Sequence, residues 1–342
     1  MRIPMLGVNI LATILLLAAQ EAQPAQPTQP TVIVVVGASG TDEFGAQFSE
    51  WSQHWQKAAE KARARFEPIG TTESGDQSDR EQLKAALAKL SGESSAPLWL
   101  VLIGHGTFDG QAAKFNLRGP DITQNELADW LSPLKRPVAV INCTSASAPF
   151  INRLAGADRV VITATRSGNE QNFARFGQYI AAAIDDLAAD LDKDGQVSLL
   201  EAYLTACRKV QEFYEQDARL ATEHALLDDN GDGLGTPPAW FRGLRATQRA
   251  KDGASLDGTR AHQFHLVKSD RELRMPPNIR ARRDALEVQI ATLRNDKDRL
   301  DENEYYDRLG PLMLELAQIY VAVERDESTD GQAQRAGLPT AK

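Results

Sequence analysis

Four uninterrupted apolar runs constrain the fold of this chain more than any other feature of its sequence. They are Thr31–Val36, Leu98–Ile103, Pro137–Ile141 and Val160–Thr163. Strands that are apolar at every position have both faces buried, as in parallel sheets covered by helices. Segments with helical periodicity separate the runs, so we predict an α/β domain with a mainly parallel sheet over residues 31–189.

The helices of this domain are expected where apolar residues recur every three to four positions. Leu83, Leu87 and Leu90, for example, would lie along one side of a helix. The predicted helices are Glu43–Arg65, Asp79–Leu90, Gln124–Leu134, Ala146–Leu154 and Phe173–Ala189, and a short strand is predicted at Phe66–Gly70.

The composition and the charge exclude several classes of protein. The 342 residues are 42% hydrophobic and 25% charged, which is typical of a globular chain and not of a disordered or collagen-like one. The net charge of −9 argues against a nucleic-acid binder, because such a protein needs a basic surface. Between Asp185 and Asp232 there are 13 acidic and 4 basic residues. This window contains the whole net charge, which indicates a cation site.

Residues 1–22 have the pattern of a secretory signal peptide. Arg2 supplies a positive charge, Met5–Ala19 is nearly all apolar, and Ala22 offers a cleavage point. The apolar run has about 15 residues, whereas a membrane span needs about 20. We therefore expect an exported chain, periplasmic or secreted, with no stable membrane insertion after cleavage; a retained N-terminal anchor is the alternative. Residues 23–30 are expected to form a Pro/Gln linker.

The C-terminal part predicts a helical hairpin over residues 280–325. A short connection at 301–303 joins two segments with apolar stripes, which suggests an antiparallel pair. We expect the stripes to pack on each other and on the α/β domain, with a second chain as the alternative; the sequence does not define the oligomeric state. Residues 242–279 are expected to form an irregular connector, and residues 326–342 a disordered tail.

Two residues capable of nucleophilic chemistry follow neighbouring apolar runs. His105 comes directly after Leu98–Ile103 and Gly104, and Cys143 follows Pro137–Ile141 and Asn142. Ligands of parallel α/β sheets bind at the carboxyl ends of the strands, so both residues are expected at one edge. An imidazole beside a thiol favours the reactive thiolate. Gly106 lets the backbone approach a substrate closely, so that its N–H group can face a developing oxyanion.

These residues resemble the characteristic blocks of the caspase-like cysteine peptidases, which include caspases, metacaspases, legumain and gingipain. Leu102–Gly110 looks like the histidine block, Val138–Cys143 like the cysteine block, and Ile162–Glu170 like the strand and pocket loop of the legumain-type branch. The resemblance implies a three-layer α/β/α fold. It also implies an endopeptidase with Cys143 as nucleophile, His105 as general acid and base, and an oxyanion hole made by the N–H groups of Gly106 and Cys143.

The resemblance also suggests where a substrate side chain would bind. Ser167 and Glu170 follow the fourth apolar run, and a carboxylate in the pocket would favour a basic substrate side chain. The sequence departs from the family at Asn142, where a small residue is usual, and it lacks the acidic residue common after the cysteine. These departures leave an inactive peptidase-like interaction module as the alternative function.

The acidic window contains a complete calcium-loop pattern. Aspartates occupy positions 1, 3 and 5, a glycine makes the turn at position 6, and position 7 offers a backbone carbonyl. A hydroxyl follows at position 9 and a glutamate at position 12. The predicted ligands are Asp190, Asp192, Asp194, Gln196, Ser198 and Glu201. Ca²⁺ prefers about seven oxygens, which this spacing brings together. The loop resembles an EF-hand, so we assign residues 190–241 as an EF-hand-like segment with Ca²⁺ as the cofactor.

A second acidic loop begins at Asp228 and includes Asn230, Asp232 and Gly233. Its twelfth position is Ala239, and two prolines interrupt the expected exit helix. We read it as a degenerate partner loop or as a simple turn. Together, the patterns predict an exported, calcium-binding cysteine endopeptidase acting on peptide or protein substrates.

Overall fold

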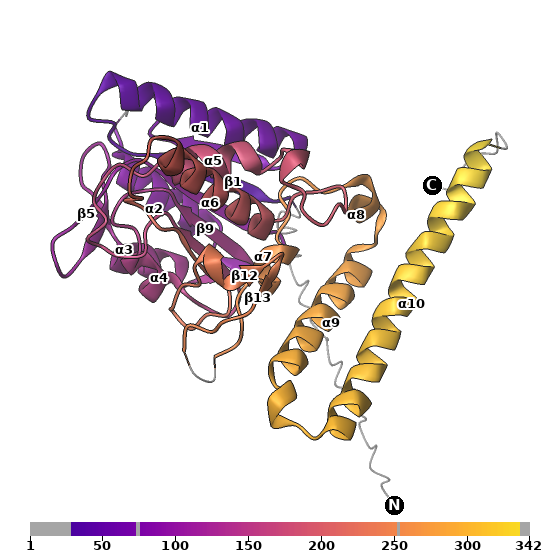
Figure 1. The fold of residues 1–342 in the computed structure, drawn as a ribbon. Helices are drawn as coiled ribbons and strands as arrows, with labels where there is room; N and C mark the ends of the chain where they lie inside the picture. Colours follow the sequence, from indigo (N-terminus) through magenta and orange to yellow (C-terminus); the bar gives the residue numbers. More distant parts are fainter. Residues whose placement is uncertain (1–28, 73–75, 252–253, 336–342) are drawn as a thin grey trace, which may run out of the picture.

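The structure, a computed structural model, describes residues 29–72, 76–251 and 254–335. Its centre is a six-stranded sheet in the order β11-β10-β9-β4-β1-β2 (Figure 1). Five strands are parallel to their neighbours, and β11 (Leu226–Asp228) is antiparallel to β10. The parallel strands are β1 (Thr31–Val36), β2 (Arg65–Ile69), β4 (Leu98–Ile103), β9 (Val138–Asn142) and β10 (Arg159–Thr163). The predicted α/β domain with a mainly parallel sheet is confirmed.

Helices cover both faces of the sheet and form three layers. One face carries α1 (Asp42–Lys61), α5 (Phe176–Ala183) and α6 (Leu199–Gln216), and the other carries α2 (Asp79–Lys89), α3 (Gln124–Leu131) and α4 (Pro149–Leu154). Side chains alternate between the two resulting cores: Trp99, Val101 and Ile103 enter the α1 side, and Leu98, Leu100 and Leu102 enter the α2 side. This period of two holds along every buried strand and decides which residues face the candidate site.

Residues 145–148 form a buried loop, not the first turn of a helix as predicted. Helix α4 starts only at Pro149, because proline suits the first helical position and lacks the N–H group that an interior position would need. Similarly, α5 stops at Ala183, and a short 3-10 turn, η1 (Leu187–Ala189), leads into the first acidic loop.

The segment 190–241 joins the α/β domain directly. Helix α6 packs on α5, and β11 extends the central sheet beside β10. The expected exit helix of the second acidic loop is absent from the described residues; the chain instead forms the turn η2 (Pro238–Trp240).

The region expected to be an irregular connector contains regular elements. Strands β12 (Phe241–Arg242) and β13 (Arg245–Ala246) pair as a small hairpin, followed by α7 (Thr259–Gln263) and α8 (Asp270–Arg274). Elsewhere, β3 (Gly92–Glu93) pairs with β8 (Leu134–Lys135). A three-stranded sheet is formed by β5 (Gly106–Phe108), β6 (Ala113–Phe115) and β7 (Ile122–Thr123). These short strands lack the long apolar runs that reveal the main sheet.

The predicted C-terminal helical hairpin is present, with bounds different from those expected. Helix α9 spans Pro277–Asn295, and after a 3-10 turn, η3 (Lys297–Arg299), helix α10 spans Glu302–Arg335. The backbone is therefore helical through ten residues that were assigned to the tail. The apolar stripe of α9 is buried at Leu286, Ile290 and Leu293, and α9 packs between α10 and α7.

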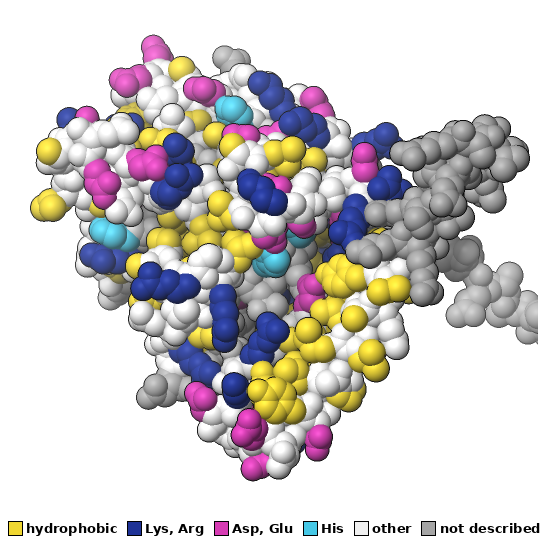
Figure 2. Space-filling view, turned by 45° about the vertical axis from the view of Figure 1, so that its right-hand side comes forward, with side chains coloured by type: hydrophobic (Ala, Val, Ile, Leu, Met, Phe, Trp, Pro, Cys, Tyr) yellow, Lys and Arg dark blue, Asp and Glu magenta, His cyan; other side chains and the backbone are white. Residues whose placement is uncertain are grey.

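The outer face of α10 exposes apolar side chains. Tyr306, Met313, Leu314 and Val321 are between 41% and 61% exposed. Figure 2 shows an apolar band over the C-terminal hairpin. The predicted signal peptide and most of the linker lie outside the described residues. Among the described helices, none combines the length and the apolar character that a membrane crossing requires.

Candidate functional site

His105 and Cys143 lie at adjacent strand ends, as the sequence predicts. Strands β4 and β9 are parallel neighbours in which Leu102 is opposite Asn142. Both residues also continue the alternation of their strands toward the α1 side of the sheet, since Ile103 and Ile141 face that core. The topology therefore brings the two side chains to the same edge and the same face.

The same alternation buries Cys143. Its side chain belongs to the core under α1 and α5 and is only 1% exposed. Gly177 of α5 packs directly on it, since a Cβ added at Gly177 would lie 2.8 Å from the Cys143 Cβ and 2.6 Å from Trp51. Burial, assisted by the negative charge of Glu223, raises the pKa of the Cys143 thiol. In this conformation the residue is a neutral core thiol.

The His105 imidazole is held by aromatic rings and by a backbone carbonyl. Its Nε2 lies 3.1 Å from the backbone carbonyl oxygen of Ser39. Ring centroids of Phe44, Phe48 and Phe173 lie 4.9, 5.3 and 5.9 Å from that of His105. Throughout the described residues, no hydrogen bond joins His105 to Cys143.

Both predicted oxyanion donors already have acceptors. The Gly106 N–H donates to Ser145 Oγ at 3.1 Å, and Ser145 Oγ donates back to the Gly106 carbonyl at 3.0 Å. The Cys143 N–H donates to the Leu102 carbonyl at 2.9 Å as part of the β4–β9 ladder. A side chain at position 106 would clash, because its Cβ would lie 2.2 Å from the Ser145 carbonyl oxygen. Gly106 therefore permits close packing of the Cys143–Ala148 loop in this conformation.

The loop after Cys143 is closed and buried. Residues 143–148 all have buried side chains, and Asn142 Oδ1 accepts hydrogen bonds from the backbone N–H and the hydroxyl of Thr144. Asn142 Nδ2 is buried and has no hydrogen-bond partner among the described residues. Ala146 adopts a φ of 54°, a left-handed conformation that costs a non-glycine residue free energy.

Glu170, a predicted pocket residue, is engaged in a different network. Its Oε1 lies 2.6 Å from His224 Nδ1, and its Oε2 accepts the N–H of Arg166 at 3.0 Å. Ser167 Oγ accepts the N–H of Asn169. Beside this network lies a cavity of about 570 Å³ that Arg166, His224, Cys207 and Glu223 help to line. Neither His105 nor Cys143 lines it, so it is separate from the predicted catalytic pair.

Glu223 is a structural anchor that sequence reasoning missed. It is 3% exposed, and its carboxylate accepts the N–H groups of Arg175 and Phe176 at 2.9 Å, at the start of α5. The Tyr214 hydroxyl donates to it at 3.2 Å. Burial raises the pKa of Glu223. Its position in a charged stretch gave no signal of burial.

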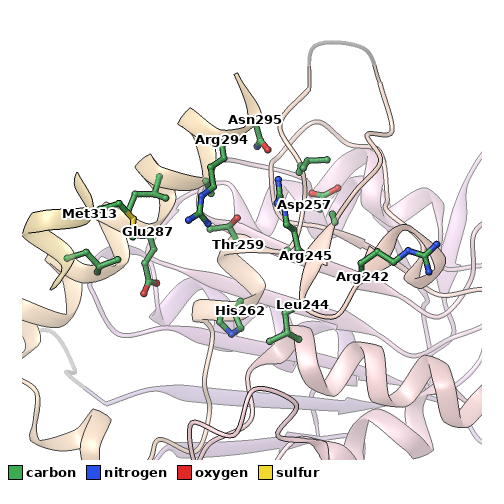
Figure 3. Close-up of a pocket in the computed structure, with 16 residues that line it drawn as sticks. Arg242, Leu244, Arg245, Asp257, Thr259, His262, Glu287, Arg294, Asn295 and Met313 are labelled. Atoms are coloured by element: carbon green, nitrogen blue, oxygen red, sulfur yellow. The ribbon is translucent and has the colours of Figure 1, made fainter. Parts of the chain in front are cut away.

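A second cavity, of about 420 Å³, lies between the β12–β13 hairpin and the C-terminal hairpin (Figure 3). Arg242, Arg245 and Arg294 line it together with apolar residues. His262, at its edge, contacts Asp192 of the first acidic loop with an Nε2–Oδ2 distance of 3.0 Å. His265, three residues further on, is half-buried, and its Nδ1 lies 3.2 Å from the Gln263 carbonyl oxygen.

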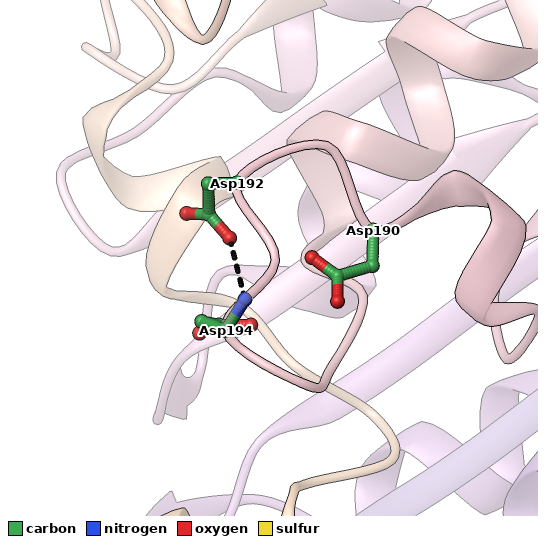
Figure 4. A group of neighbouring side chains, drawn as sticks. All are labelled: Asp190, Asp192 and Asp194. Atoms are coloured by element: carbon green, nitrogen blue, oxygen red, sulfur yellow. Dashed lines mark hydrogen bonds between the residues drawn. The ribbon is translucent and has the colours of Figure 1, made fainter.

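The first acidic loop brings three predicted calcium ligands together. Carboxylate oxygens of Asp190, Asp192 and Asp194 all lie within 4.8 Å of one another (Figure 4). Asp190 accepts the N–H groups of Lys193 and Gly195 at 2.7 and 3.1 Å, and these two residues have left-handed φ angles of 65° and 88°. The turn therefore folds around the first aspartate, as the glycine at position 6 predicts.

The later ligand positions are also close to the loop. Glu201 is 1% exposed, and its Oε1 accepts the N–H of Leu191 at 2.7 Å. Its Oε2 accepts both the N–H and the hydroxyl of Ser198 at 2.8 Å, which forms the capping box of α6. Gln196 Nε2 bonds to Asp194. The predicted ligand atoms are all oxygens, the type of ligand that Ca²⁺ prefers, so the residues present fit this ion.

The second acidic loop repeats around Asp228 the turn that the first loop forms around Asp190. Asp228 accepts the N–H groups of Gly231 and Gly233, at 3.1 and 2.8 Å. Asp229 accepts those of Gly258 and Ala261 at 2.8 Å and holds the start of α7. Burial raises the pKa of Asp228 to about 7. These carboxyl groups hold the turn, and its assignment as a degenerate partner loop or as a simple turn stays a prediction.

Comparisons with known proteins concern the fold. No family model matches the chain, and no curated protein matches it. Among solved structures, caspase-1 from Spodoptera frugiperda is 10% identical with a TM-score of 0.36; the alignment covers 59% of this chain and 88% of that one. The Drosophila initiator caspase Dronc is 14% identical with a TM-score of 0.36, and the alignment covers 61% of this chain and 85% of that one. No site residue is transferred from either.

Proposed function

We propose that this protein is a calcium-binding protein on a caspase-like α/β scaffold that does not cleave peptides in the described conformation. The observation that carries the calcium assignment is the convergence of Asp190, Asp192 and Asp194 within 4.8 Å, in a loop with Glu201 at its end. Three carboxylates this close together repel each other unless a cation neutralises them. Their spacing and all-oxygen chemistry favour Ca²⁺.

Calcium would act on the structure of the domain in this proposal. The loop joins the η1 turn to α6, and α6 packs on α5, which covers Cys143. Ca²⁺ would therefore stabilise the helical layer over the candidate catalytic pair. At a hundredfold excess over its dissociation constant, the ion would add about 2.7 kcal/mol to the free energy of unfolding.

Melting curves with Ca²⁺ and with a chelator test the calcium assignment. We expect Ca²⁺ to raise the Tm of the wild type by several degrees and to leave Glu201→Gln nearly unchanged. Asp217→Asn serves as the control, because Asp217 is an exposed acid outside the loop, and this variant should respond like the wild type. Equal melting temperatures of the wild type in both conditions, together with no binding heat in a Ca²⁺ titration, would overturn the assignment.

A second candidate function is the cysteine endopeptidase that the sequence predicts. Its support is the placement of His105 and Cys143 at adjacent strand ends on one face of the sheet. Against it stand the burial of Cys143 and the engaged N–H groups of Gly106 and Cys143. Activity would require the Cys143–Ala148 loop to move, so that the thiol and both N–H groups become accessible.

A mixed peptide library and a thiol-directed peptide probe separate the two functions. The non-cleaving proposal expects no hydrolysis above the level of Cys143→Ala, with or without Ca²⁺, and no labelling of Cys143 that depends on His105. Hydrolysis by the wild type that is lost in both Cys143→Ala and His105→Ala would establish the endopeptidase and overturn the non-cleaving proposal. The calcium assignment is tested separately, by the melting curves, and neither result of the peptide experiments would overturn it.

We also propose that the chain is exported, on the basis of the signal pattern in residues 1–22. Mass spectrometry of the protein recovered from an exporting host should give a mature N-terminus close to Ala22. A membrane-bound product that retains Met1 would support the anchor instead.

A further inference from the structure

The cavity between the β12–β13 hairpin and the C-terminal hairpin contains three arginines without an acidic partner. Arg242 and Arg245 come from β12 and β13, and Arg294 comes from the last turn of α9. All three side chains are exposed, and none of their guanidinium groups forms an ion pair or hydrogen bond with any described residue; their backbone groups pair within the β12–β13 hairpin and α9. Guanidinium groups that share a cavity repel one another, so this arrangement favours the binding of an anion.

The two acids that line the same cavity are already engaged. Asp257 accepts two backbone N–H groups and the Thr236 hydroxyl. Glu287 accepts hydrogen bonds from Gln263 at 3.0 Å and from the Tyr320 hydroxyl at 3.1 Å. Neither carboxylate forms a salt bridge with an arginine of the described chain, so the cationic groups remain available for a ligand.

The positions of the donors suggest which anion fits. In Figure 3 the guanidinium groups of Arg245 and Arg294 lie on either side of Thr259, while Arg242 reaches away to the side. Two guanidinium groups and a hydroxyl offer more donors than the two oxygens of a carboxylate can accept. A phosphate group has three oxygens for them, and arginine binds phosphate through paired hydrogen bonds.

The remaining lining is apolar. Leu244, Ile290, Met313 and Leu316 contribute to the cavity, and Met313 is 41% exposed. Figure 2 shows Lys and Arg side chains gathered beside the apolar band of the C-terminal hairpin. A volume of about 420 Å³ suits a small molecule. We propose that this cavity binds a phosphate monoester that carries an apolar group. The proposal does not rest on the proposed calcium loop, which touches the edge of the cavity through the contact of His262 with Asp192.

Calorimetric titration of the full chain with hexyl phosphate tests the proposal, with a chelator present so that no metal ion links phosphate to the acidic loop. Arg245→Gln and Arg294→Gln should each weaken binding about tenfold, as expected for losing hydrogen bonds to a charged group. Arg153→Gln is the matched control, because Arg153 is exposed on α4 outside the cavity. Arg153→Gln should bind hexyl phosphate with the same affinity as the wild type.

Two further ligands test the chemical class. Inorganic phosphate should bind about tenfold more weakly than hexyl phosphate, because it buries no apolar surface. Hexanoate should also bind about tenfold more weakly, because it has fewer acceptors. Equal affinity for hexyl phosphate and either simpler ligand would overturn the proposed class, and equal loss in Arg153→Gln and Arg245→Gln would overturn the site. Circular dichroism of each variant confirms that the fold is intact.

Discussion

At the scale of single residues, the absence of a side chain at position 177 decides how Cys143 is packed. Gly177 lies in α5, where alanine would be the better helix former. It nevertheless packs so closely against Trp51 and Cys143 that there is no room for a Cβ atom. Close packing of this kind means that the covering helix and the thiol move together.

We predict that Gly177→Ala lowers the free energy of unfolding by about 1–3 kcal/mol, the usual cost of overpacking a core. Gly310→Ala is the control, because a Cβ added at Gly310 in α10 would meet no heavy atom within 4 Å outside its chain neighbours and its own helix. That change should alter the free energy of unfolding little, because alanine gains helix propensity while its Cβ crowds the ring of Pro311. Chemical denaturation measures both, and a Gly177→Ala variant as stable as the wild type would contradict the described packing at Cys143.

The sequence could place His105 and Cys143 at one edge, since strand ends and parallel pairing suffice for that. It could not show that Cys143 is buried, although the alternation Ala139, Ile141, Cys143 carries a signal for its face. The strand pattern does not indicate which residues cover that face. Only the tertiary structure shows that Gly177 and Trp51 pack over the thiol. The engagement of Glu170 with His224 depends in the same way on residues 54 positions apart.

At the scale of elements, the C-terminal hairpin is tied to the body by a buried ion pair. Arg283 of α9 bonds to Glu272 of α8 through two contacts, at 2.5 and 2.9 Å, and both side chains are at most 10% exposed. Arg283 also pairs with Asp284 at 2.6 Å, so removal of Glu272 breaks two hydrogen bonds to a charged group and leaves one ion pair in place.

Glu272→Ala should therefore destabilise the attachment of the hairpin by about 1.5–3 kcal/mol. Hydrogen exchange should show faster exchange of α9 and α10, with the central sheet unchanged. Glu315→Gln tests an exposed ion pair on the same helices, since Glu315 contacts Arg282 at the surface, and little change is expected. Unchanged protection of α9 in Glu272→Ala would show that apolar packing alone holds the hairpin.

The long elements were predictable because each has a periodic signal of its own. Strands β1 and β4 match their predicted bounds, and the starts of α2 and α3 agree because a serine and a threonine cap them. Strand β11 was missed because it has three residues and overlaps the acidic loop at Asp228. Its strand character comes from pairing with β10, a contact that local sequence cannot reveal.

At the scale of the whole molecule, buried carboxyl groups set the pH dependence of stability. Burial raises the pKa of Glu223 and of Asp228, the latter to about 7. Burial raises the pKa of Asp229, and burial together with the charge of Asp229 raises that of Asp257 to about 8. Above about pH 4 the unfolded chain loses these protons, whereas the folded chain keeps those of Asp228 and Asp257 up to about pH 7. The folded state then binds more protons, so stability falls as pH rises across this window.

Melting in the presence of a chelator should thus give a higher Tm at pH 5.5 than at pH 7.5. Asp257→Asn should reduce this difference, because the amide does not titrate. Below about pH 4 stability should fall again, because hydrogen bonds to Arg283 lower the pKa of Glu272 and its protonation breaks that ion pair. A Tm that rises between pH 5.5 and 7.5 would contradict the assignment of protonated buried carboxyls.

The burial of Cys143 has a consequence for measuring motion. A core thiol reacts with a small alkylating reagent only when the layer above it opens, so its alkylation rate measures how often that layer opens. Cys207, half-buried beside the 570 Å³ cavity, reports in the same way on opening around that cavity. In Cys207→Ala we expect alkylation of Cys143 to be far slower than in the denatured chain and slower still with Ca²⁺. Alkylation at the denatured rate would mean that the edge of the sheet stands open in solution.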